Sequence, residues 1–506
     1  MYARVMSTGL FGLDGYAVTV EADTGRGLPA FDIVGLPDAA VSESRERVRA
    51  AIRNRGFEFP VSRITVNLAP ADKRKSGPVY DLPILLAVLL ASSQINCDIS
   101  GAAFFGELSL DGRLRAVNGA LSMALAAQEA GIKRLFVPLE NAAEAAVAEE
   151  LEVYGAEGLD SLIAHLKNER PLPRARALDF SAEAPLYPID FADVKGQLAA
   201  RRALEVAAAG SHNLLLVGPP GAGKSMLAKR LPTILPPLSY EEAVETTRIY
   251  SAAGALSRRD RLIAERPFRS PHHTVSAAGL TGGGSVPKPG EISLAHNGVL
   301  FLDELPEFGR RSMEVLRQPL EDGEVTISRV AGALSYPCSF ILAAAMNPCP
   351  CGNYGSKKEC LCSAAAVERY LSRVSGPLLD RIDLHVEVAA VDYEAVSDKA
   401  KGESSKAIRE RVMAARELQQ RRSGSAAANA RLSPAETREF CRLTEKGEKT
   451  LARAFETLGL SARAYDKVLR VARTIADLDS SELIDSRHVA EAVQYRALDK
   501  KYWLRR

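Results

Sequence analysis

One eight-residue segment constrains the fold of this 506-residue chain more than any other. An apolar run, Leu214–Val217, leads into it, and Met226 to Leu231 follow as a helical stretch that we expect to stop at Pro232. The segment reads Gly218, Pro219, Pro220, Gly221, Ala222, Gly223, Lys224 and Ser225, which is G-x-x-x-x-G-K-[ST] between a strand and a helix. Such glycines let backbone N–H groups close around phosphate oxygens, and the helix N-terminus adds its dipole. We therefore expect all eight residues to bind a nucleotide, with Lys224 on the β- and γ-phosphates and Ser225 on Mg²⁺.

Two carboxylates close a second apolar strand, which covers Val299–Leu302. Asp303 is expected to hold Mg²⁺ through water, and Glu304 to orient and polarise the attacking water. A solvated acidic pair is the alternative for the two carboxylates taken alone. Beside a phosphate loop, Glu304 favours ATP hydrolysis over nucleotide binding only.

A third apolar run, Phe340–Ala344, leads to Asn347. A polar side chain at the tip of a strand beside the phosphate-loop strand can contact the γ-phosphate or the attacking water. We assign Asn347 that sensing role, with an Asx turn before Pro348 as the alternative.

The apolar pattern divides the chain into four parts. Residues 1–165 predict a mixed α/β domain, and the proline-containing segment 166–189 predicts a linker. Residues 190–390 alternate strands and helices as a doubly wound parallel sheet requires, and residues 391–506 predict a helical domain. Within the first part, strands are expected at Ala17–Val20, Ile64–Leu68 and Leu135–Val137, and helices at Ala39–Asn54 and Gly119–Ala130. In the last part, Ser433-Pro434 with Glu436 predicts a capped helix start, and Ser461 opens a helix that carries Arg463, Arg470 and Arg473.

Charge and hydropathy exclude several classes of protein. Lys+Arg 65 against Asp+Glu 63 gives a net charge of +2, so no global field attracts nucleic acid or a membrane. The longest apolar run, Leu82 to Ala91, is too short to cross a bilayer, and no secretory signal is visible. We expect a cytoplasmic protein without membrane association.

Four of the seven cysteines crowd into one short segment. Cys349-Pro350-Cys351 and Cys360-Leu361-Cys362 are separated by eight residues. Four thiolates on one loop can close a tetrahedral, non-catalytic Zn²⁺ site, whereas C-x-C spacing leaves free reduced thiols as the alternative. Cys338 precedes the Asn347 strand, which argues against its membership in the set.

The order of these segments resembles a known clade of ATPases. The segments that carry the resemblance are the phosphate loop, Gly298–Glu304, Asn347 and Gly376-Pro377-Leu378-Leu379-Asp380-Arg381-Ile382-Asp383. They resemble the AAA+ ATPases of the magnesium-chelatase and MCM-helicase clade. Within it, the chain is identified as a member of the YifB/ComM family, from Phe31–Pro37 near the N-terminus to Ala464–Leu478. The resemblance implies a hexameric ATP-driven motor on single-stranded, forked or branched DNA that promotes branch migration in homologous recombination and natural transformation.

The same resemblance implies roles for three arginines. Arg381 would act in trans on a neighbouring subunit's nucleotide, although a surface salt bridge is its simpler interpretation from the residues alone. Arg463 would sense the γ-phosphate from the helical lid. A hairpin over Glu324–Gly332 would project into the pore and offer Arg329 to the DNA backbone. The segment Arg266 to Gly284 is too irregular for the core sheet and resembles the clade's second pore insertion; its adjacent histidines, His272 and His273, rarely face one metal ion.

The N-terminal part resembles the catalytic domain of Lon protease over Gly106–Val117. Lon needs a serine directly after Gly-Pro and a lysine downstream, and Val79 and Leu121 stand at those positions, so peptidase chemistry is absent. We expect a non-proteolytic module for DNA contact or ring assembly. Lys73, Arg74 and Lys75 are expected to form an exposed basic loop.

Four functions remain to be weighed: a ring-forming DNA helicase, a magnesium-chelatase motor subunit, a Lon-like protease and an ATP-switched scaffold that does not translocate. Val79 and Leu121 oppose the protease. The first 165 residues and the cysteine segment have no place in a chelatase motor subunit.

Overall fold

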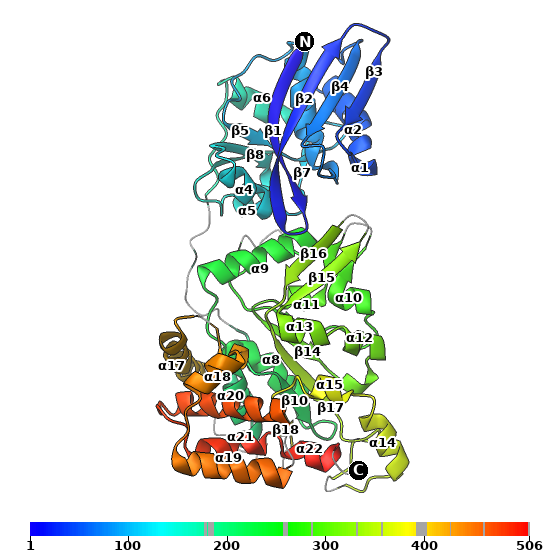
Figure 1. Ribbon diagram of the computed structural model, residues 1–506. Helices are drawn as coiled ribbons and strands as arrows, with labels where there is room; N and C mark the ends of the chain where they lie inside the picture. Colours follow the sequence, from blue (N-terminus) through cyan, green and yellow to red (C-terminus); the bar gives the residue numbers. More distant parts are fainter. Residues whose placement is uncertain are drawn as a thin grey trace. The chain divides into compact units, whose positions relative to one another are not determined.

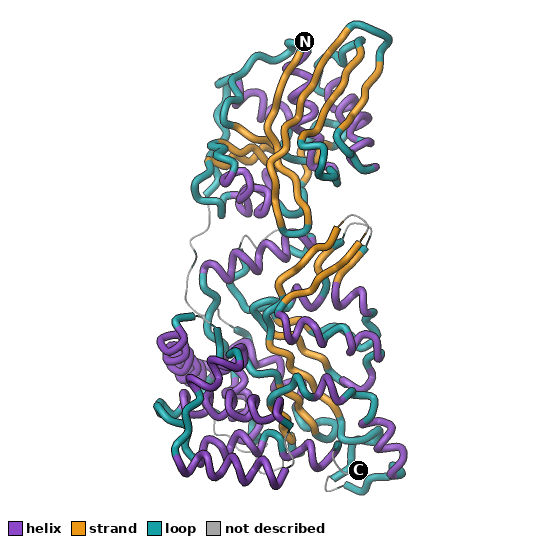
Figure 2. The backbone as a smooth tube through the Cα atoms, in the orientation of Figure 1, coloured by secondary structure: helices purple, strands orange, loops and turns teal. Residues whose placement is uncertain are grey.

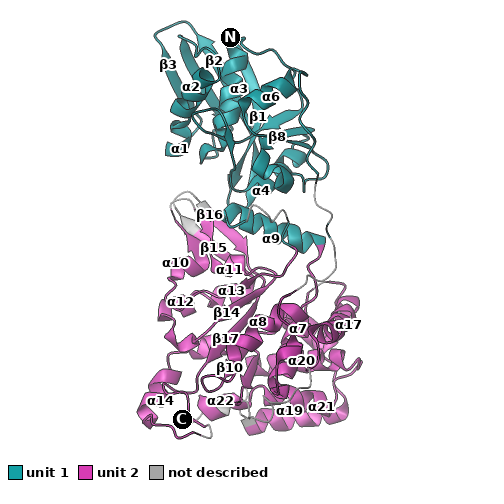
Figure 3. Ribbon diagram, turned by 180° about the vertical axis from the view of Figure 1, so that it is seen from behind, with its two compact units in different colours: residues 1–181, 240–263 teal, residues 182–239, 264–506 magenta. Residues whose placement is uncertain are grey.

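The structure is a computed structural model, and its described residues form two compact units. They are 1–176, 180, 187–256, 262–284, 287–329, 332–355, 358–390, 402–425, 427–458 and 461–503. Unit 1 holds residues 1–181 and 240–263, and unit 2 holds residues 182–239 and 264–506 (Figure 3). Most of the second half of the expected linker, 177–179 and 181–186, lies outside the described residues, as do Val330 and Ala331 of the expected hairpin.

A mixed sheet organises unit 1, with seven strands in the part of the chain that the structure describes (Figure 1). In sheet order they are β3 (Ala30–Val34), β4 (Arg63–Ala69), β2 (Asp14–Gly25), β1 (Tyr2–Phe11), β5 (Ala102–Phe104), β8 (Arg134–Pro138) and β9 (Glu152–Ala156). β2 pairs antiparallel with both of its neighbours, β1 and β4. All the other pairings are parallel: β3 with β4, β1 with β5, β5 with β8, and β8 with β9. The three strands predicted for this part are confirmed. A small hairpin of β6 (Glu107–Leu108) and β7 (Leu114–Arg115) lies outside the sheet.

Six helices precede the linker in unit 1 among the described residues. They are α1 (Ala39–Ser42), α2 (Ser44–Asn54), α3 (Asp81–Ala91), α4 (Ala120–Glu129), α5 (Ala142–Ala145) and α6 (Leu159–Leu166). The single helix expected over Ala39–Asn54 is wrong, because the chain breaks it at Glu43. The longest apolar run forms α3, which is buried almost throughout, at about 1.5–3 kcal/mol for each large side chain. At its start, buried Asp81 is paired with Arg47 Nε at 2.6 Å.

A helix from the middle of the sequence completes unit 1. It is α9 (Tyr240–Ala253), which contacts α4 and is coloured with unit 1 in Figure 3. Arg248 donates to Leu13 O at 2.9 Å, and Ser251 O accepts from Gly119 N at 3.2 Å. Ser251 Oγ also donates to buried Glu144, whose carboxyl pKa is raised by burial. Specific hydrogen bonds therefore hold α9 to the rest of unit 1, in addition to its apolar contacts.

A parallel sheet forms the centre of unit 2, as the near-continuous apolar runs predict (Figures 1 and 2). Its five described strands, in order, are β11 (Phe268–Arg269), β14 (Val299–Leu302), β17 (Ile341–Met346), β10 (Leu214–Val217) and β18 (Leu384–Glu387). Every residue of β10, β14 and β17 is buried. The expectation that Arg266 to Gly284 stays out of this sheet is wrong: β11 pairs with β14 at the sheet edge. Two residues at an edge need no long apolar pattern.

Short helices and two hairpins accompany this sheet in unit 2. The elements are α7 (Leu198–Gly210), α8 (Lys224–Ile234), α10 (Ala277–Thr281), β12 (Gly282–Gly283), β13 (Lys288–Pro289), α11 (Glu291–Leu294), α12 (Arg310–Glu314), α13 (Arg317–Asp322), β15 (Glu324–Arg329), β16 (Gly332–Pro337), α14 (Ala364–Leu371) and α15 (Gly376–Leu379). The predicted stop of α8 at Pro232 is wrong, because this proline lies within the last turn, where it removes only one helical hydrogen bond.

Helices alone make up the described C-terminal region, which Figure 1 colours orange to red. They are α17 (Ser405–Ser423), α18 (Pro434–Phe440), α19 (Glu445–Leu458), α20 (Ala462–Leu478), α21 (Ser486–Gln494) and α22 (Ala497–Tyr502). The predicted capping box of Ser433 and Glu436 is present, and Ser461 caps α20. Arg473 of α20 is 1% exposed and bonds Asp477 at 3.0 Å, so this arginine belongs to the core and not to a charged face.

Among the described residues, no helix combines the length and the apolar character needed to cross a bilayer.

Candidate active site

The phosphate loop joins β10 to α8 and is wrapped around the Lys224 side chain. Lys224 Nζ donates to Gly218 O at 2.7 Å and to Pro219 O at 2.9 Å. Gly223 caps α8 with a φ of 88°, which favours glycine. The first glycine is required for another reason: a Cβ on Gly218 would lie 2.1 Å from Val388 O. The loop therefore has the close packing and the helix terminus that a phosphate group needs.

One hydroxyl oxygen and one carboxylate oxygen meet at the start of α8. Ser225 Oγ donates to Asp303 Oδ2 at 2.6 Å. The two residues meet because β14, which ends before Asp303, is separated from the phosphate-loop strand β10 only by β17 in the parallel sheet. Oxygen ligands of this kind suit Mg²⁺, so the pair predicted from sequence fits the ion.

Glu304 directly follows Asp303 and is exposed. Its backbone φ is 53°, its N–H donates to Asp303 Oδ1 at 3.0 Å, and its side chain is 60% exposed. An exposed carboxylate next to a magnesium-type site can act as a base toward water. The structure also places His273 Nδ1 3.9 Å from Glu304 Oε2. The His272 and His273 ring centroids lie 4.0 Å apart with the rings tilted by 35°, and neither residue belongs to a metal-ligand group in the described part of the chain.

Asn347 lies at the carboxyl end of β17 and contacts the phosphate-loop lysine. Its Oδ1 accepts from Lys224 Nζ at 3.1 Å. Burial lowers the pKa of Lys224, and Asp303 and Glu304 oppose that shift. The lysine is thus held between carbonyl, amide and carboxylate oxygens at the place where phosphates would compete for it.

Arg381 and Arg463 lie together, in a cavity of about 350 Å³. The cavity is also lined by Arg431, Lys467 and Arg470, and no phosphate-loop residue is among its described lining residues. Arg381 is held by Glu321, and it donates to Arg317 O at 3.1 Å and to Pro377 O at 2.6 Å. Four carboxylates line the same cavity, Glu321, Asp380, Asp383 and Asp466, so five cations are largely balanced there.

A buried network fixes the lid helix to the wall of this cavity. Asp383 accepts from Lys467 Nζ at 2.7 Å and faces His212 Nδ1 at 3.3 Å. Burial raises the pKa of Asp383, but Lys467 and His212 hold it well below its usual range. His212 Nε2 meets Thr474 Oγ1 of α20 at 2.8 Å, so α20 is bonded to the parallel sheet through Asp383 and His212.

The hairpin β15–β16 is formed as predicted over its described residues. Arg329 ends β15 and pairs in register with Gly332. Its backbone therefore lies at the end of the hairpin where residues 330 and 331, outside the described part, connect the two strands.

The two positions of unit 1 that match Lon's catalytic serine and lysine hold buried apolar residues. Val79 is 8% exposed and Leu121 is fully buried, and neither offers a nucleophile or a base. One expectation for this unit is wrong: Lys75 is not part of an exposed basic loop. It is buried, its Nζ donates to Pro70 O and to Lys73 O, and burial lowers its pKa.

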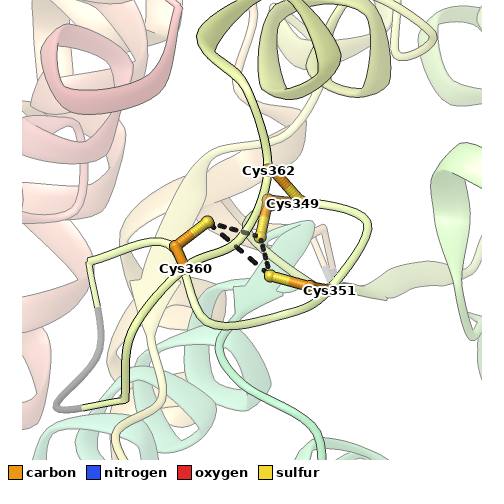
Figure 4. Close-up of side chains that lie close together, drawn as sticks. All are labelled: Cys349, Cys351, Cys360 and Cys362. Carbon is orange, nitrogen blue, oxygen red and sulfur yellow. Dashed lines mark hydrogen bonds between the residues drawn. The ribbon is translucent and has the colours of Figure 1, made fainter.

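The four clustered cysteines converge on one point, as Figure 4 shows. The Sγ atoms of Cys349, Cys351 and Cys360 are 3.4, 3.7 and 3.6 Å apart, and that of Cys362 completes a set within 4.8 Å. A tetrahedral ZnS₄ site with 2.3 Å bonds requires sulfur separations of about 3.8 Å. An iron–sulfur cluster would hold the thiolates farther apart, because its inorganic core lies between them. The cluster can hold zinc. Cys338 is buried elsewhere, with its pKa raised to about 12 by burial.

One thiol of the cluster already ionises readily. A backbone N–H of Asn353 and the Cys349 thiol lower the pKa of Cys351 to about 6. The pKa of Cys360 is raised to about 12: a backbone bond from Cys362 lowers it, but desolvation and the neighbouring thiols raise it by more. A dication bound by the four sulfurs would stabilise their thiolate forms.

Sequence reasoning missed three contacts of this site. His273 beside Glu304 and Glu321 beside Arg381 join residues that are far apart in sequence, and no local pattern marks either one. Gly352 packs against the phosphate loop, as described below. Its position inside the cysteine segment was the only available signal.

Comparison with known proteins gives a consistent result along the chain. Residues 190–396 match the family model described as magnesium chelatase, subunit ChlI, residues 20–141 match subunit ChlI of Mg-chelatase, and residues 402–496 match the subunit ChlI C-terminal model. YifB of Salmonella typhimurium is 46% identical over 98% of this chain and 97% of its own length. Competence protein ComM of Haemophilus influenzae is 44% identical over 98% and 97%. Lon protease 2 of Bacillus subtilis is 30% identical over 31% of this chain.

Proposed function

Because this chain belongs to the magnesium-chelatase-like family of YifB and ComM, we propose that it is a ring-forming AAA+ ATPase that translocates on DNA. Its role would be that of a helicase or branch-migration motor in homologous recombination and natural transformation. The observation that carries this proposal is the separation of two half-sites on one chain: the phosphate loop with Asp303 and Glu304, and the arginine cavity.

In the first half-site, the chain's own groups bind and orient ATP. The loop 218–225 holds the phosphates, Lys224 leaves Gly218 O and Asn347 for the β- and γ-oxygens, and Ser225 and Asp303 hold Mg²⁺. Bound Mg²⁺ would neutralise charge on the phosphate oxygens. Glu304 orients the attacking water and accepts its proton, and Asn347 reports on the γ-phosphate.

The second half-site is proposed to act on the neighbour's nucleotide. Arg381 and Arg463 share one cavity that contains no described residue of their own phosphate loop. A closed ring would give each ATP both half-sites, from two identical subunits. This arrangement supports a homo-hexamer. We therefore assign Arg463 to sensing the neighbouring subunit's nucleotide instead of its own.

DNA is the proposed track. The hairpin β15–β16 carries Arg329 at the end where its two strands are connected, and one cation per subunit would make a charged pore in a near-neutral chain. The relative named competence protein ComM, 44% identical over nearly the full length, supports a role in competence, that is, in natural transformation.

Two other functions have support of their own. The matching family models carry the name of a magnesium-chelatase subunit, which favours a chelatase-type motor. One of them covers residues 20–141, so the expectation that the first 165 residues have no place in such a subunit is wrong. An ATP-switched scaffold without translocation would use the same site.

Turnover of ATP, titrated with single-stranded, forked and four-way-junction DNA, separates these functions. A DNA motor is stimulated by at least one of these substrates, a chelatase motor only by its porphyrin-chelatase partners, and a scaffold by none. Lys224→Ala serves as the control for contaminating hydrolysis. Unstimulated turnover with all three DNAs would exclude the motor.

A further inference from the structure

The cysteine cluster lies against the phosphate loop at two points. Before the cluster, Asn347 accepts from Lys224 Nζ at 3.1 Å, two residues ahead of Cys349. Within it, buried Gly352 packs on Pro220: a Cβ at this position would lie 2.3 Å from Pro220 Cδ and 2.7 Å from its Cγ. Gly352 has a φ of 81°, so it is held in this approach by a backbone conformation that other residues rarely adopt.

Gly352 is also fixed to the cluster itself. It directly follows Cys351, and its N–H donates to Cys349 O at 3.0 Å. Two residues on, Tyr354 N donates to Cys349 Sγ at 3.3 Å. The position of Gly352 therefore depends on where the Cys349 and Cys351 sulfurs are held, and these sulfurs have the separations of a tetrahedral thiolate site.

We infer that the four cysteines bind one Zn²⁺ ion and that this metal centre clamps the phosphate loop by holding Gly352 against Pro220. With the ion bound, Pro219 and Pro220 are supported from outside and the loop keeps the shape that its phosphate ligand needs. Without it, the sulfurs are free to separate, Gly352 moves away from Pro220, and the loop loses that support. ATP affinity thus depends on zinc, although zinc never touches the nucleotide. This inference rests on the proposed nucleotide site.

Three features distinguish a clamp from a remote structural ion. The four ligands come from one short loop, so the ion orders that loop and not a whole domain. The loop begins directly after the sensor position Asn347. Its close approach to Pro220 leaves no room for even a methyl group.

The test combines metal content with nucleotide affinity in the full-length protein. Zinc per chain is measured by mass spectrometry, and the Kd of a fluorescent ATP analogue by titration. We expect about one zinc per wild-type chain, and absorption bands of tetrahedral cobalt thiolate after exchange with Co²⁺. The double substitution Cys351→Ser with Cys360→Ser should remove the metal and weaken ATP binding by about tenfold or more.

Gly352→Ala tests the clamp without touching a ligand. It should keep the zinc and still weaken ATP binding by a similar factor. Gly355→Ala is the matched control, because Gly355 also has a positive φ, 74°, but its Cβ would meet only the Lys501 side chain, at 3.7 Å. That variant carries a comparable backbone strain and should bind ATP normally. Circular dichroism and thermal melting confirm folding of each variant.

Each outcome decides a different point. Wild-type protein without zinc, or a cysteine variant with normal ATP affinity, overturns the metal's role. Normal affinity in Gly352→Ala overturns the clamp. Failure of the wild-type protein to bind ATP at all would instead refute the proposed nucleotide site.

Discussion

Arg381 and Glu321 form an ion pair between the arginine cavity and the helix that leads into the hairpin. Glu321 lies on α13, two residues before Gly323 and three before the start of β15. The Arg381 side chain is 12% exposed, whereas that of Glu321 is 54% exposed. An arginine that leaves this pair for a neighbour's phosphate would release the base of the hairpin, which would link nucleotide contact to the element proposed to contact DNA.

Arg381→Ala should leave nucleotide binding intact and reduce ATP turnover by a factor on the order of 10³, as expected for an arginine finger. Steady-state hydrolysis and analogue titration measure the two effects. Mixing this variant with Lys224→Ala should restore turnover, because mixed rings contain interfaces with an intact half-site from each chain. Absence of any rescue would argue against action in trans.

Glu321→Gln should lower the ATP concentration at half-maximal turnover. The carboxylate competes with phosphate for Arg381, and a partly exposed pair is worth about 0.5–1 kcal/mol, which corresponds to roughly twofold to fivefold. Asp322→Asn, the adjacent exposed acid, is the control and should leave this concentration unchanged. A higher ATP requirement in Glu321→Gln would show that the pair supports the active state.

Glu304→Gln should bind ATP normally but hydrolyse it about 10²–10⁴ times more slowly, because the amide cannot accept the proton of the attacking water. Lys224→Ala should instead lose nucleotide binding. Glu307→Gln, which removes the nearby pair with Arg373 at 2.9 Å, provides the control and should retain turnover. Equal binding defects in the Glu304 and Lys224 variants would contradict their separate roles.

Arg329→Ala should lower DNA-stimulated ATPase more than basal ATPase. It should also reduce the slope of log affinity against log salt by roughly 0.7 for each lost contact with single-stranded DNA. Arg438→Ala, an exposed arginine on α18, is the comparison. A uniform loss of basal and stimulated turnover would remove Arg329 from the pore.

Stability should fall as the pH drops below about 6.5. Burial lowers the pKa of His212 and His385, and Asp383 and Asp499, respectively, oppose the shift only in part. The unfolded chain therefore takes up protons first, and each histidine contributes a loss of up to about 1.4 kcal/mol per pH unit between its unfolded and folded pKa.

Urea unfolding at pH 7.5, 6.5 and 5.5 measures this dependence. His385→Asn should flatten it, whereas His272→Asn, at an exposed site, should not. Equal midpoints at all three pH values would mean that the buried histidines do not control acid stability.

Sequence predicts the catalytic half-site well because each of its parts is local. A phosphate loop, an acidic strand end and a polar strand tip are contiguous motifs, and a parallel sheet brings the carboxyl ends of neighbouring strands to one edge. The Ser225–Asp303 bond and the Asn347–Lys224 bond follow from that topology. Their catalytic roles stay predictions.

The remaining contacts could not be predicted, because they depend on packing between distant segments. The cavity shared by Arg381 and Arg463 depends on the position of α20, which the buried Asp383–Lys467 ion pair fixes. Lys75 reads as part of a basic loop, yet its ammonium is bonded to backbone carbonyls. A two-residue edge strand such as β11 leaves almost no periodic signal.

The position of α9 in unit 1 affects how the chain can be shortened. By the division of the described residues, the chain passes between the units at 181–182, 239–240 and 263–264, so a protease nick in the first passage leaves two covalent tethers. Deleting residues 1–181 would remove the hydrogen-bond partners of Arg248 and Ser251 on α9, which are Leu13, Gly119 and Glu144. A shortened ATPase should therefore be designed without α9 as well as without residues 1–181.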